Sequence, residues 1–134
     1  MLYVTRKEHF SASHRLHNPE FDKLGNEELF GKCNNFHGHN YYLEVTIAGK
    51  VDPKSGYVVD MKILKSIILN EIIERVDHKF LNEVDLFKDV IPTTENMALT
   101  FWDILNRKIN FHNAKLFSIK LYETEKNFVE LRID

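Results

Sequence analysis

The residues best suited to chemistry lie in one short segment, GKCNNFHGHNYYLEV, at positions 31–45. It contains the only cysteine of the chain, Cys33, and two histidines, His37 and His39, that are separated by one glycine. On an extended backbone both imidazoles would project from the same side, about two strand rises apart. His14, on an alternating segment of its own, would supply a third nitrogen if its strand paired with the one that starts at His39. Three neutral imidazoles with a free fourth position are typical of a catalytic zinc site, whereas a structural site holds four protein ligands.

Other sites are compatible with the same spacing. A thiolate is also a zinc ligand, so a site of Cys33, His37 and His39 fits the spacing equally well, and an H-x-H pair is often just two polar residues beside a loop. The pattern His37-x-His39-x4-Glu44, followed by a later histidine, is also similar to the metal motif of the all-β cupin barrels. We disfavour a cupin because an amphipathic helix is expected over residues 60–76 and because Glu44 would face the opposite side of the strand from His39.

Cys33 and the dipeptide Asp77-His78 are candidates for acid–base chemistry. A thiol acts as a base or nucleophile near neutral pH when positive charge stabilises its thiolate, and Lys32 or a nearby metal would provide that charge. His78 would receive or return the proton, with Asp77 orienting its ring or acting beside it. An Asp-His pair at a helix end is also a common capping or dipole feature. We assign Cys33, Asp77 and His78 as candidate catalytic residues.

Glu123 follows an apolar strand expected over residues 117–122, where an inward-facing carboxylate would need hydrogen-bond donors. A planar ligand with an amino-pyrimidinone edge presents two adjacent N–H groups, and one carboxylate accepts both in a fork. Thr94 and Glu95, at the start of an expected helix, would complete such a cradle. Without such a ligand, Glu123 would be a turn residue.

The elements that must position these residues are predicted from periodicity. Strands are expected over residues 10–16, 41–48, 57–59, 117–122 and 129–133, with a loop over residues 17–28. Asp60 would cap a helix that reaches Val76, and Thr93 would cap a second helix with the apolar stripe Met97, Ala98, Phe101, Trp102 and Leu105. Because the strands come in adjacent pairs, we expect an α+β fold in which an antiparallel sheet carries the helices on one face. Its open edges predict a homo-oligomer.

Composition restricts the class of protein. A chain of 134 residues with 43% hydrophobic and 28% charged residues is expected to form a single globular domain over residues 1–134. The net charge is −2 and no Lys/Arg run is present, so a nucleic-acid partner is not expected. No apolar stretch approaches the roughly 18 residues of a membrane span, and the start MLYVTRKEHF has no apolar core of a signal peptide. We therefore expect no membrane partner and a cytoplasmic location.

Six segments resemble, in order and nearly end to end, the 6-pyruvoyl-tetrahydropterin synthase / 6-carboxytetrahydropterin synthase family. They are FSASHRL, FGKCNNFHGHNY, VDPKSGYVVDMKILK, VDHKFLN, PTTENMALTFWDIL and KLYETEKNFVE. The combination of C-x3-H-G-H, D-H-K-x-L-N, T-T-E-N and Y-E-T is far more specific than any one of these motifs. The resemblance implies the tunnelling fold, or T-fold, in which trimers close their sheets into a barrel and two trimers stack into a hexamer.

The resemblance also implies a zinc-dependent lyase that acts on 7,8-dihydroneopterin triphosphate, with active sites between subunits. Zinc would be held by His14, His37 and His39. Cys33 would be the proton-abstracting base. The remaining implied roles, in proton relay and in anchoring the pterin, fall on Asp77, His78 and Glu123. Candidates for the triphosphate, by proximity to the motifs, are Arg15, Lys32 and Lys79.

The family divides by product, and the sequence has features of two branches. The compact C-x3-H-G-H of this chain is similar to the branch that forms 6-carboxy-5,6,7,8-tetrahydropterin and acetaldehyde in the queuosine pathway, whereas the pyruvoyl-forming branch has two more residues in that loop. Asn34-Asn35, His39-Asn40-Tyr41 and the T-T-E-N motif are closer to the pyruvoyl branch. A third, folate-linked branch replaces the cysteine with glutamate, so Cys33 argues against it. Because loop length sets how far the thiol reaches over the metal, we predict the carboxy-forming reaction, with the pyruvoyl synthase as the alternative. A non-catalytic zinc or pterin-binding module is the alternative of another class.

Overall fold

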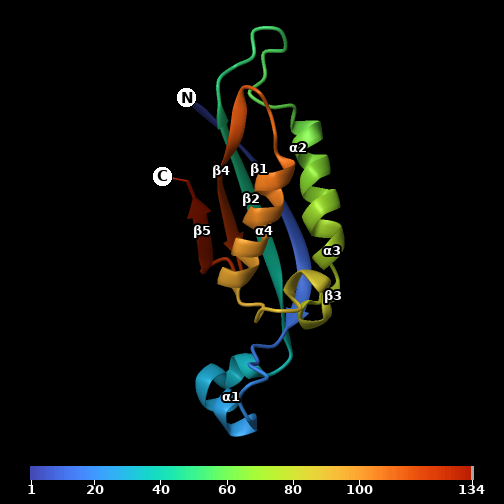
Figure 1. Cartoon of the computed structure of the whole chain (residues 1–134), viewed down its shortest axis with the longest axis vertical. Helices are drawn as coiled ribbons and strands as arrows, with labels where there is room; N and C mark the ends of the chain where they lie inside the picture. The colour runs from blue at the N-terminus through green and yellow to red at the C-terminus, as the bar shows by residue number, and fades with distance from the viewer. Residues whose placement is uncertain (134) are drawn as a thin grey trace.

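A computed structural model, which describes residues 1–133, contains one five-stranded sheet with helices packed against it (Figure 1). The strands lie in the order β3-β1-β2-β4-β5. Their bounds are β1 Leu2–His14, β2 His37–Gly49, β3 Lys79–Phe80, β4 Ala114–Tyr122 and β5 Phe128–Arg132. The pairs β1–β2, β2–β4 and β4–β5 are antiparallel, and the short β3 pairs in parallel with β1. The predicted α+β class is confirmed.

The register between β1 and β2 decides which side chains meet. Phe10 lies opposite Tyr41, Ala12 opposite His39, and His14 opposite His37. Directly opposed residues of an antiparallel pair share one face of the sheet, and their chain neighbours share the other. We call the face of Phe10, on which the buried residues lie, the core face. The other, which carries Ser11 and Ser13, is the outer face.

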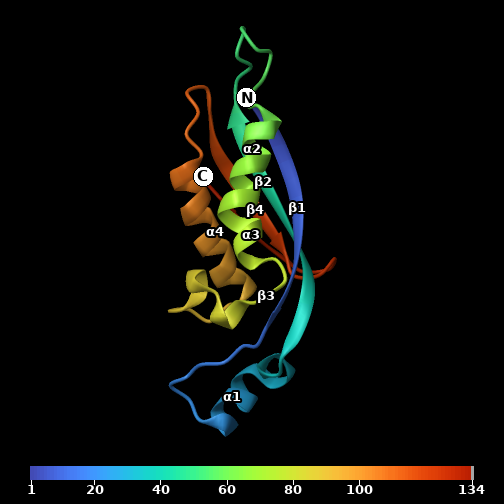
Figure 2. The same ribbon diagram turned by 90° about the vertical axis from the view of Figure 1, so that its right-hand side faces the viewer.

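The first long helical segment covers the core face beside β1 (Figure 2). It comprises α2 (Met61–Ile68), a π-helical turn at Leu69–Ile73 and α3 (Glu74–Val76), and its first turn is capped by the Asp60 carboxylate. Its buried stripe repeats every four residues, at Leu64, Ile68, Ile72 and Val76. A straight α-helix rotates such a repeat by roughly 40° per step, because it has 3.6 residues per turn. The wider π turn absorbs part of that rotation and keeps the stripe against the sheet.

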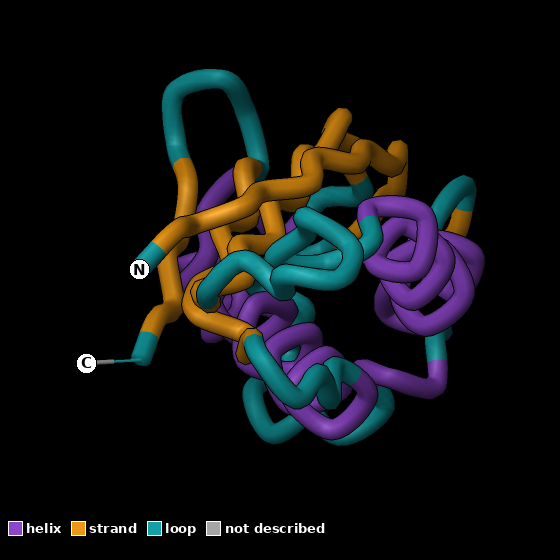
Figure 3. The backbone as a smooth tube through the Cα atoms, turned by 90° about the horizontal axis from the view of Figure 1, so that it is seen from above, coloured by secondary structure: helices purple, strands orange, loops and turns teal. Residues whose placement is uncertain are grey.

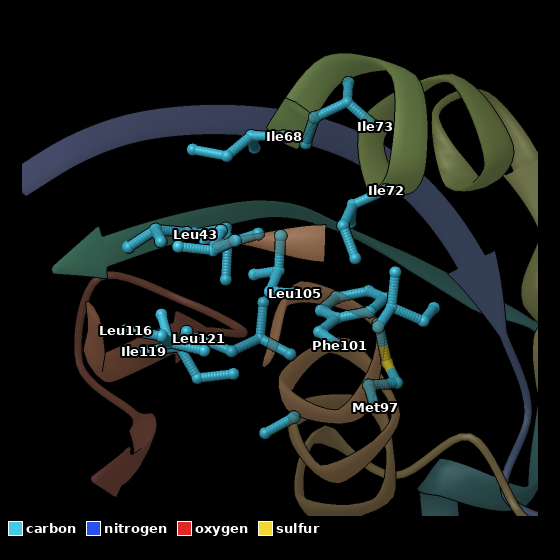
Figure 4. Close-up of a cluster of buried hydrophobic side chains, with 14 of the residues drawn as sticks. Leu43, Ile68, Ile72, Ile73, Met97, Phe101, Leu105, Leu116, Ile119 and Leu121 are labelled. Carbon is cyan, nitrogen blue, oxygen red and sulfur yellow. The ribbon is translucent and has the colours of Figure 1, made fainter. Parts of the chain in front are cut away.

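The second long helix, α4 (Thr94–Lys108), packs on the same face of the sheet, as the view from above also shows (Figure 3). The Thr93 hydroxyl caps it by accepting a hydrogen bond of 3.1 Å from the backbone N–H of Asn96. Residues of α4 and of the sheet interdigitate in the core shown in Figure 4. Fully buried members of that core include Leu43, Ile68, Ile72, Met97, Phe101, Leu105 and Leu121.

Most of the predicted elements are confirmed. The two N-terminal strands, the helices capped by Asp60 and Thr93, and the two C-terminal strands are all present, and β1 and β2 are longer than expected. Within residues 1–133 no helix is long and apolar enough to span a membrane.

Two element predictions are wrong. The expected strand at residues 57–59 is irregular backbone, in which the Val58 carbonyl accepts a hydrogen bond from the Asn113 side chain instead of joining a ladder. The expected loop over residues 17–28 contains most of helix α1 (Lys23–Phe30), capped by the Asp22 carboxylate. Its apolar residues are largely exposed, so no apolar stripe reveals it; Asn26 is instead buried and bonds the carbonyls of the preceding loop. Figure 1 shows α1 at the far end of β1 and β2, away from the other helices.

Candidate metal centre and its surroundings

Three histidines from two strands meet at the end of the core face. His14 ends β1, His37 begins β2, and His39 follows two residues later. One ligand nitrogen from each ring lies within 4.8 Å of the other two. The ring centroids are 4.5 Å apart for His14 and His37, 5.2 Å for His14 and His39, and 5.0 Å for His37 and His39. This separation allows one divalent cation to contact all three rings.

Backbone carbonyls orient two of the three rings. The Nδ1 atom of His14 lies 2.8 Å from the Pro92 carbonyl, and the Nδ1 atom of His37 lies 2.7 Å from the Asn35 carbonyl. A carbonyl only accepts, so each Nδ1 carries the hydrogen and each Nε2 keeps a lone pair for a metal. The Nε2 atom of His39 is buried and has no hydrogen-bond partner among residues 1–133. A buried, unsatisfied nitrogen beside two oriented lone pairs fits a metal ligand set.

The surroundings favour the neutral form of His14 and His39, which is the form that binds a metal. Burial lowers the pKa of His14, outweighing its bond to the Pro92 carbonyl. Burial also lowers the pKa of His39, against the opposing effect of the nearby Glu123 carboxylate. The neighbouring His37 lowers both values further, because two like charges would repel.

Tyr41 lies next to the cluster on the buried side. Its ring is stacked on Phe10 with centroids 4.8 Å apart, and its hydroxyl lies 3.5 Å from both nitrogens of His14. Its side chain is fully buried, and this burial raises the pKa of the phenol. Sequence reasoning missed this residue, although the alternation His37, His39, Tyr41 already places it on the same face.

Glu123 joins the histidine cluster to a small pocket. One carboxylate oxygen lies 3.7 Å from the Nε2 atom of His39, and the other accepts a hydrogen bond of 2.7 Å from the Thr94 hydroxyl. Thr94 and Glu95 line this pocket of about 220 Å³ together with Glu123. The residues that sequence reasoning missed are on the turn and on β5, namely Asn127, Phe128 and Val129.

Asp77 and His78 form a pair at the edge of the sheet. The Asp77 carboxylate accepts a hydrogen bond of 3.0 Å from the backbone N–H of Ser11 and lies 2.9 Å from the Nδ1 atom of His78. The Ser11 hydrogen bond is the main cause of a lowered pKa for Asp77. His78 has a φ of 60° and is the only non-glycine residue of 1–133 in the left-handed region. The backbone N–H of His78 donates a hydrogen bond of 2.7 Å to the Ser11 carbonyl, which holds the residue in this conformation.

The Asp77–His78 pair lies on one side of the sheet, and the imidazoles of the three clustered histidines lie on the other. The side chain of His78 is 82% exposed and lines a pocket of about 430 Å³ with the outer-face residues Ser11, Ser13 and Asn40. The imidazoles of His14, His37 and His39 project from the core face. Within one chain, β1 and β2 therefore separate this pair from the metal cluster.

Cys33 is exposed and stands in a 3₁₀ turn at Gly31–Asn34, just before β2. Its carbonyl accepts a hydrogen bond of 2.7 Å from the N–H of Leu16, which ties the turn to the segment that follows His14. Within residues 1–133, the cluster with metal-ligand spacing includes His14 and not Cys33. The alternative site of Cys33, His37 and His39 therefore has no support in the geometry, and the thiol is left available for another role.

The match to known proteins extends over nearly the whole chain. The model of the family described as 6-pyruvoyl tetrahydropterin synthase matches residues 3–134. A Drosophila melanogaster protein named 6-pyruvoyl tetrahydrobiopterin synthase is 42% identical over 135 residues, which cover 98% of this chain and 80% of that protein. A Rickettsia bellii protein named 6-carboxy-5,6,7,8-tetrahydropterin synthase is 32% identical over 150 residues, covering 98% of this chain and 100% of that protein.

The solved structures agree with this match. The structure of Caenorhabditis elegans 6-pyruvoyl tetrahydropterin synthase superposes with a TM-score of 0.90 at 36% identity, over 99% of this chain and 96% of that one. The resemblance seen in the sequence motifs is thus confirmed. The chain has the T-fold and belongs to the 6-pyruvoyl tetrahydropterin synthase family of lyases.

Proposed function

We propose that this protein is a zinc-dependent lyase that removes triphosphate from 7,8-dihydroneopterin triphosphate. The observation that carries the proposal is the contact between Glu123 and His39, one of the three clustered histidines, because it places a metal-ligand set beside a carboxylate-lined pocket. A metal next to a site for a planar, hydrogen-bonding ring is what a lyase acting on a pterin side chain needs.

Zinc fits the residues that are present. The donors are three imidazoles, two of them fixed by carbonyls and the third with a buried, unsatisfied nitrogen. His14, His37 and His39 would hold the ion and leave a coordination position open, as in catalytic zinc sites. When bound, zinc supplies Lewis acidity that polarises a side-chain oxygen of the substrate and acidifies the adjacent C–H bond.

Glu123 would bind the pterin. Its carboxylate is held by the Thr94 hydroxyl, so its direction is set before the ligand arrives. It would accept two N–H groups from the amino-pyrimidinone edge, and Glu95, on the wall of the same pocket, would accept from a neighbouring donor. These acceptors match a ring that offers several N–H donors along one edge.

Cys33 and His78 would move the protons. The Cys33 thiolate would take a proton from a side-chain carbon, and His78, oriented by Asp77, would return one to the chain of carbons that loses triphosphate. Since His78 is on the outer face and the metal cluster on the core face, the pair would serve the metal cluster of a second copy. This supports our proposal of a homo-oligomer with sites between subunits, and the hexamer of two stacked trimers implied by the resemblance is its expected form.

For the product we propose 6-carboxy-5,6,7,8-tetrahydropterin with acetaldehyde. The support is the short connection of three residues between Cys33 and His37, which limits how far the thiol reaches over the metal. The second candidate is the 6-pyruvoyl product, favoured by the 42% identity to the Drosophila relative of that name. The two reactions differ in stoichiometry. Formation of the carboxy product consumes one molecule of water per turnover, and formation of the pyruvoyl product consumes none.

Incubation of the zinc-loaded protein with 7,8-dihydroneopterin triphosphate tests the proposal. Mass analysis should find triphosphate, acetaldehyde and a carboxypterin. Detection of a pyruvoylpterin without acetaldehyde would show that the 6-pyruvoyl product, our second candidate, is the correct one. Substrate recovered unchanged, although it binds, would favour a non-catalytic zinc or pterin-binding module.

A further inference from the structure

A pocket on the outer face has a composition suited to an anion. It has a volume of about 430 Å³ and includes Ser11, Ser13, Asn40, His78 and Lys79 in its wall. None of the residues of 1–133 that line it is acidic. The hydroxyl of Ser11 lies 2.7 Å from the Oδ1 atom of Asn40, so that oxygen is used as an acceptor and the Asn40 amide keeps its N–H donors. The wall therefore offers hydroxyl, amide and ammonium donors, and the carboxylate beside it, Asp77, is already engaged by the Ser11 N–H and the His78 ring.

Arg15 is a second cation, connected to this pocket through the rings of Phe36 and Phe80. Its backbone is fixed on both sides by Asn82, with a distance of 2.9 Å from the Arg15 N–H to Oδ1 and 2.9 Å from Nδ2 to the Arg15 carbonyl. Its guanidinium lies over the ring of Phe36, 5.3 Å from the centroid, and that ring is 5.2 Å from the ring of Phe80 in the pocket wall.

The guanidinium of Arg15 also retains an unused donor. Its Nε atom is buried, and no residue of 1–133 accepts a hydrogen bond from it. A buried N–H without an acceptor is uncommon in folded proteins and points to a missing partner. A guanidinium held by aromatic stacking presents its donors in a fixed fork, which suits phosphate oxygens.

We infer that this outer-face pocket binds the triphosphate ester of the substrate, with Lys79 and Arg15 as its cations. The assignment rests on the proposed function, because it needs a substrate in which the phosphate chain is attached next to the carbons where His78 acts. The pocket at Glu123 is unsuited to this group, since Glu95 and Glu123 would repel it. The substrate would thus span two copies, with its ring at the carboxylates of one and its phosphates at the acid-free pocket of the next.

The chain also supplies a matched control. A second pocket, of about 490 Å³, also has no acidic residue among those of 1–133 that line it, and it contains Lys50 and Lys115. It includes Gly49, the last residue of β2, whereas His37 is the first residue of that strand. The pocket is therefore remote from both the histidine cluster and His78. Removing Lys115 changes the net charge as much as removing Lys79 does, without touching the proposed site.

The test is titration of the purified oligomer with inorganic triphosphate, followed by calorimetry at low and moderate salt. We expect Lys79→Gln and Arg15→Gln each to weaken triphosphate binding by about tenfold or more, because each loses a charged hydrogen-bond donor. Lys115→Gln should bind as the unaltered protein does. Equal binding by all four proteins, or equal weakening by Lys115→Gln, would overturn the assignment, since the effect would then be absent or follow net charge alone.

A second measurement separates this inference from the proposed function. Lys79→Gln should raise the KM for 7,8-dihydroneopterin triphosphate by about tenfold, yet leave the affinity for unphosphorylated 7,8-dihydroneopterin unchanged. Loss of affinity for the unphosphorylated compound would show that Lys79 acts on the ring end, against our assignment. If the unaltered protein binds triphosphate but converts no pterin triphosphate, the proposed function fails while the anion site stands.

Discussion

The carboxylate of Glu123 lies 3.7 Å from the Nε2 atom of His39, although His39 is on β2 and Glu123 follows β4, 84 positions later in the chain. This contact joins a metal-ligand set to the pocket proposed for the pterin ring. Replacing Glu123 should therefore separate the two roles.

For Glu123→Gln we expect zinc to stay bound and the pterin to be lost. A carboxamide has one acceptor oxygen and a nitrogen that only donates, so it cannot accept two adjacent N–H groups in a fork. The mismatch costs about 1.5–3 kcal/mol, or roughly ten- to a hundredfold in affinity. Fluorescence titration with 7,8-dihydroneopterin measures the affinity, and metal analysis gives the zinc content. Glu125→Gln, on the exposed turn between β4 and β5, is the control and should bind as before. Zinc loss in Glu123→Gln would instead make the carboxylate part of the metal site.

His37→Ala should lose bound metal and activity together while the protein still folds. The side chain is only partly buried, so its truncation removes a ligand without opening the core. Elemental analysis of the purified variant measures the zinc, and circular dichroism checks the fold. His9→Ala is the matched control, because His9 is exposed on β1 and lies outside the cluster. A full zinc complement in His37→Ala would remove His37 from the ligand set.

Cys33→Ala should keep its zinc and lose turnover. The thiol is outside the cluster of three histidines, so metal content should not depend on it. If the thiolate is the base, its removal should lower kcat by about a hundred- to ten-thousandfold, the usual contribution of a positioned proton acceptor. Single-turnover assays with 7,8-dihydroneopterin triphosphate measure the effect. Unchanged turnover would show that the Cys33 thiol has no role in the reaction.

His78→Gly should be more stable than His78→Ala, although both should lose activity. At a φ of 60° a side chain costs roughly 1–2 kcal/mol relative to glycine, and the greater freedom of glycine in the unfolded chain offsets part of that. The expected difference in the free energy of unfolding is about 0.5–1 kcal/mol. Urea denaturation of the two variants under identical conditions provides the comparison. Equal or reversed stabilities would mean that the backbone relaxes once the imidazole is gone.

The free energy of unfolding of the metal-free protein should decrease as the pH falls below the ordinary pKa of histidine. Burial lowers the pKa of His14 below its ordinary value of 6.5, so the unfolded chain takes up a proton there before the folded chain does. The unfolded state then binds more protons, and stability is lost as the pH falls from about 6.5 towards the folded-state pKa, by at most about 1.4 kcal/mol per pH unit for this group. Urea titrations at a series of pH values measure the slope. His14→Gln should flatten it, and an identical slope in that variant would assign the effect to other groups.

The sequence by itself determined the local elements and the side chains that share a face. The alternation from His37 to Val45 places His37, His39 and Tyr41 on one side of a strand whatever that strand pairs with, because side chains of a strand alternate with a period of two. Asp60 and Thr93 likewise mark the two helix starts, since a capping hydroxyl or carboxylate acts within three residues. The family motifs identified the residues proposed for the site.

Only the tertiary structure decided how those residues combine. Spacing allowed either Cys33 or His14 as the third ligand, and the choice came from the β1–β2 register that sets His14 opposite His37. Register is a long-range pairing between segments far apart in the chain, so no local pattern specifies it. For the same reason the sequence did not reveal that β1 and β2 separate His78 from the metal cluster, or that Thr94 holds Glu123. Each of these depends on contacts between elements that meet only when the sheet has formed.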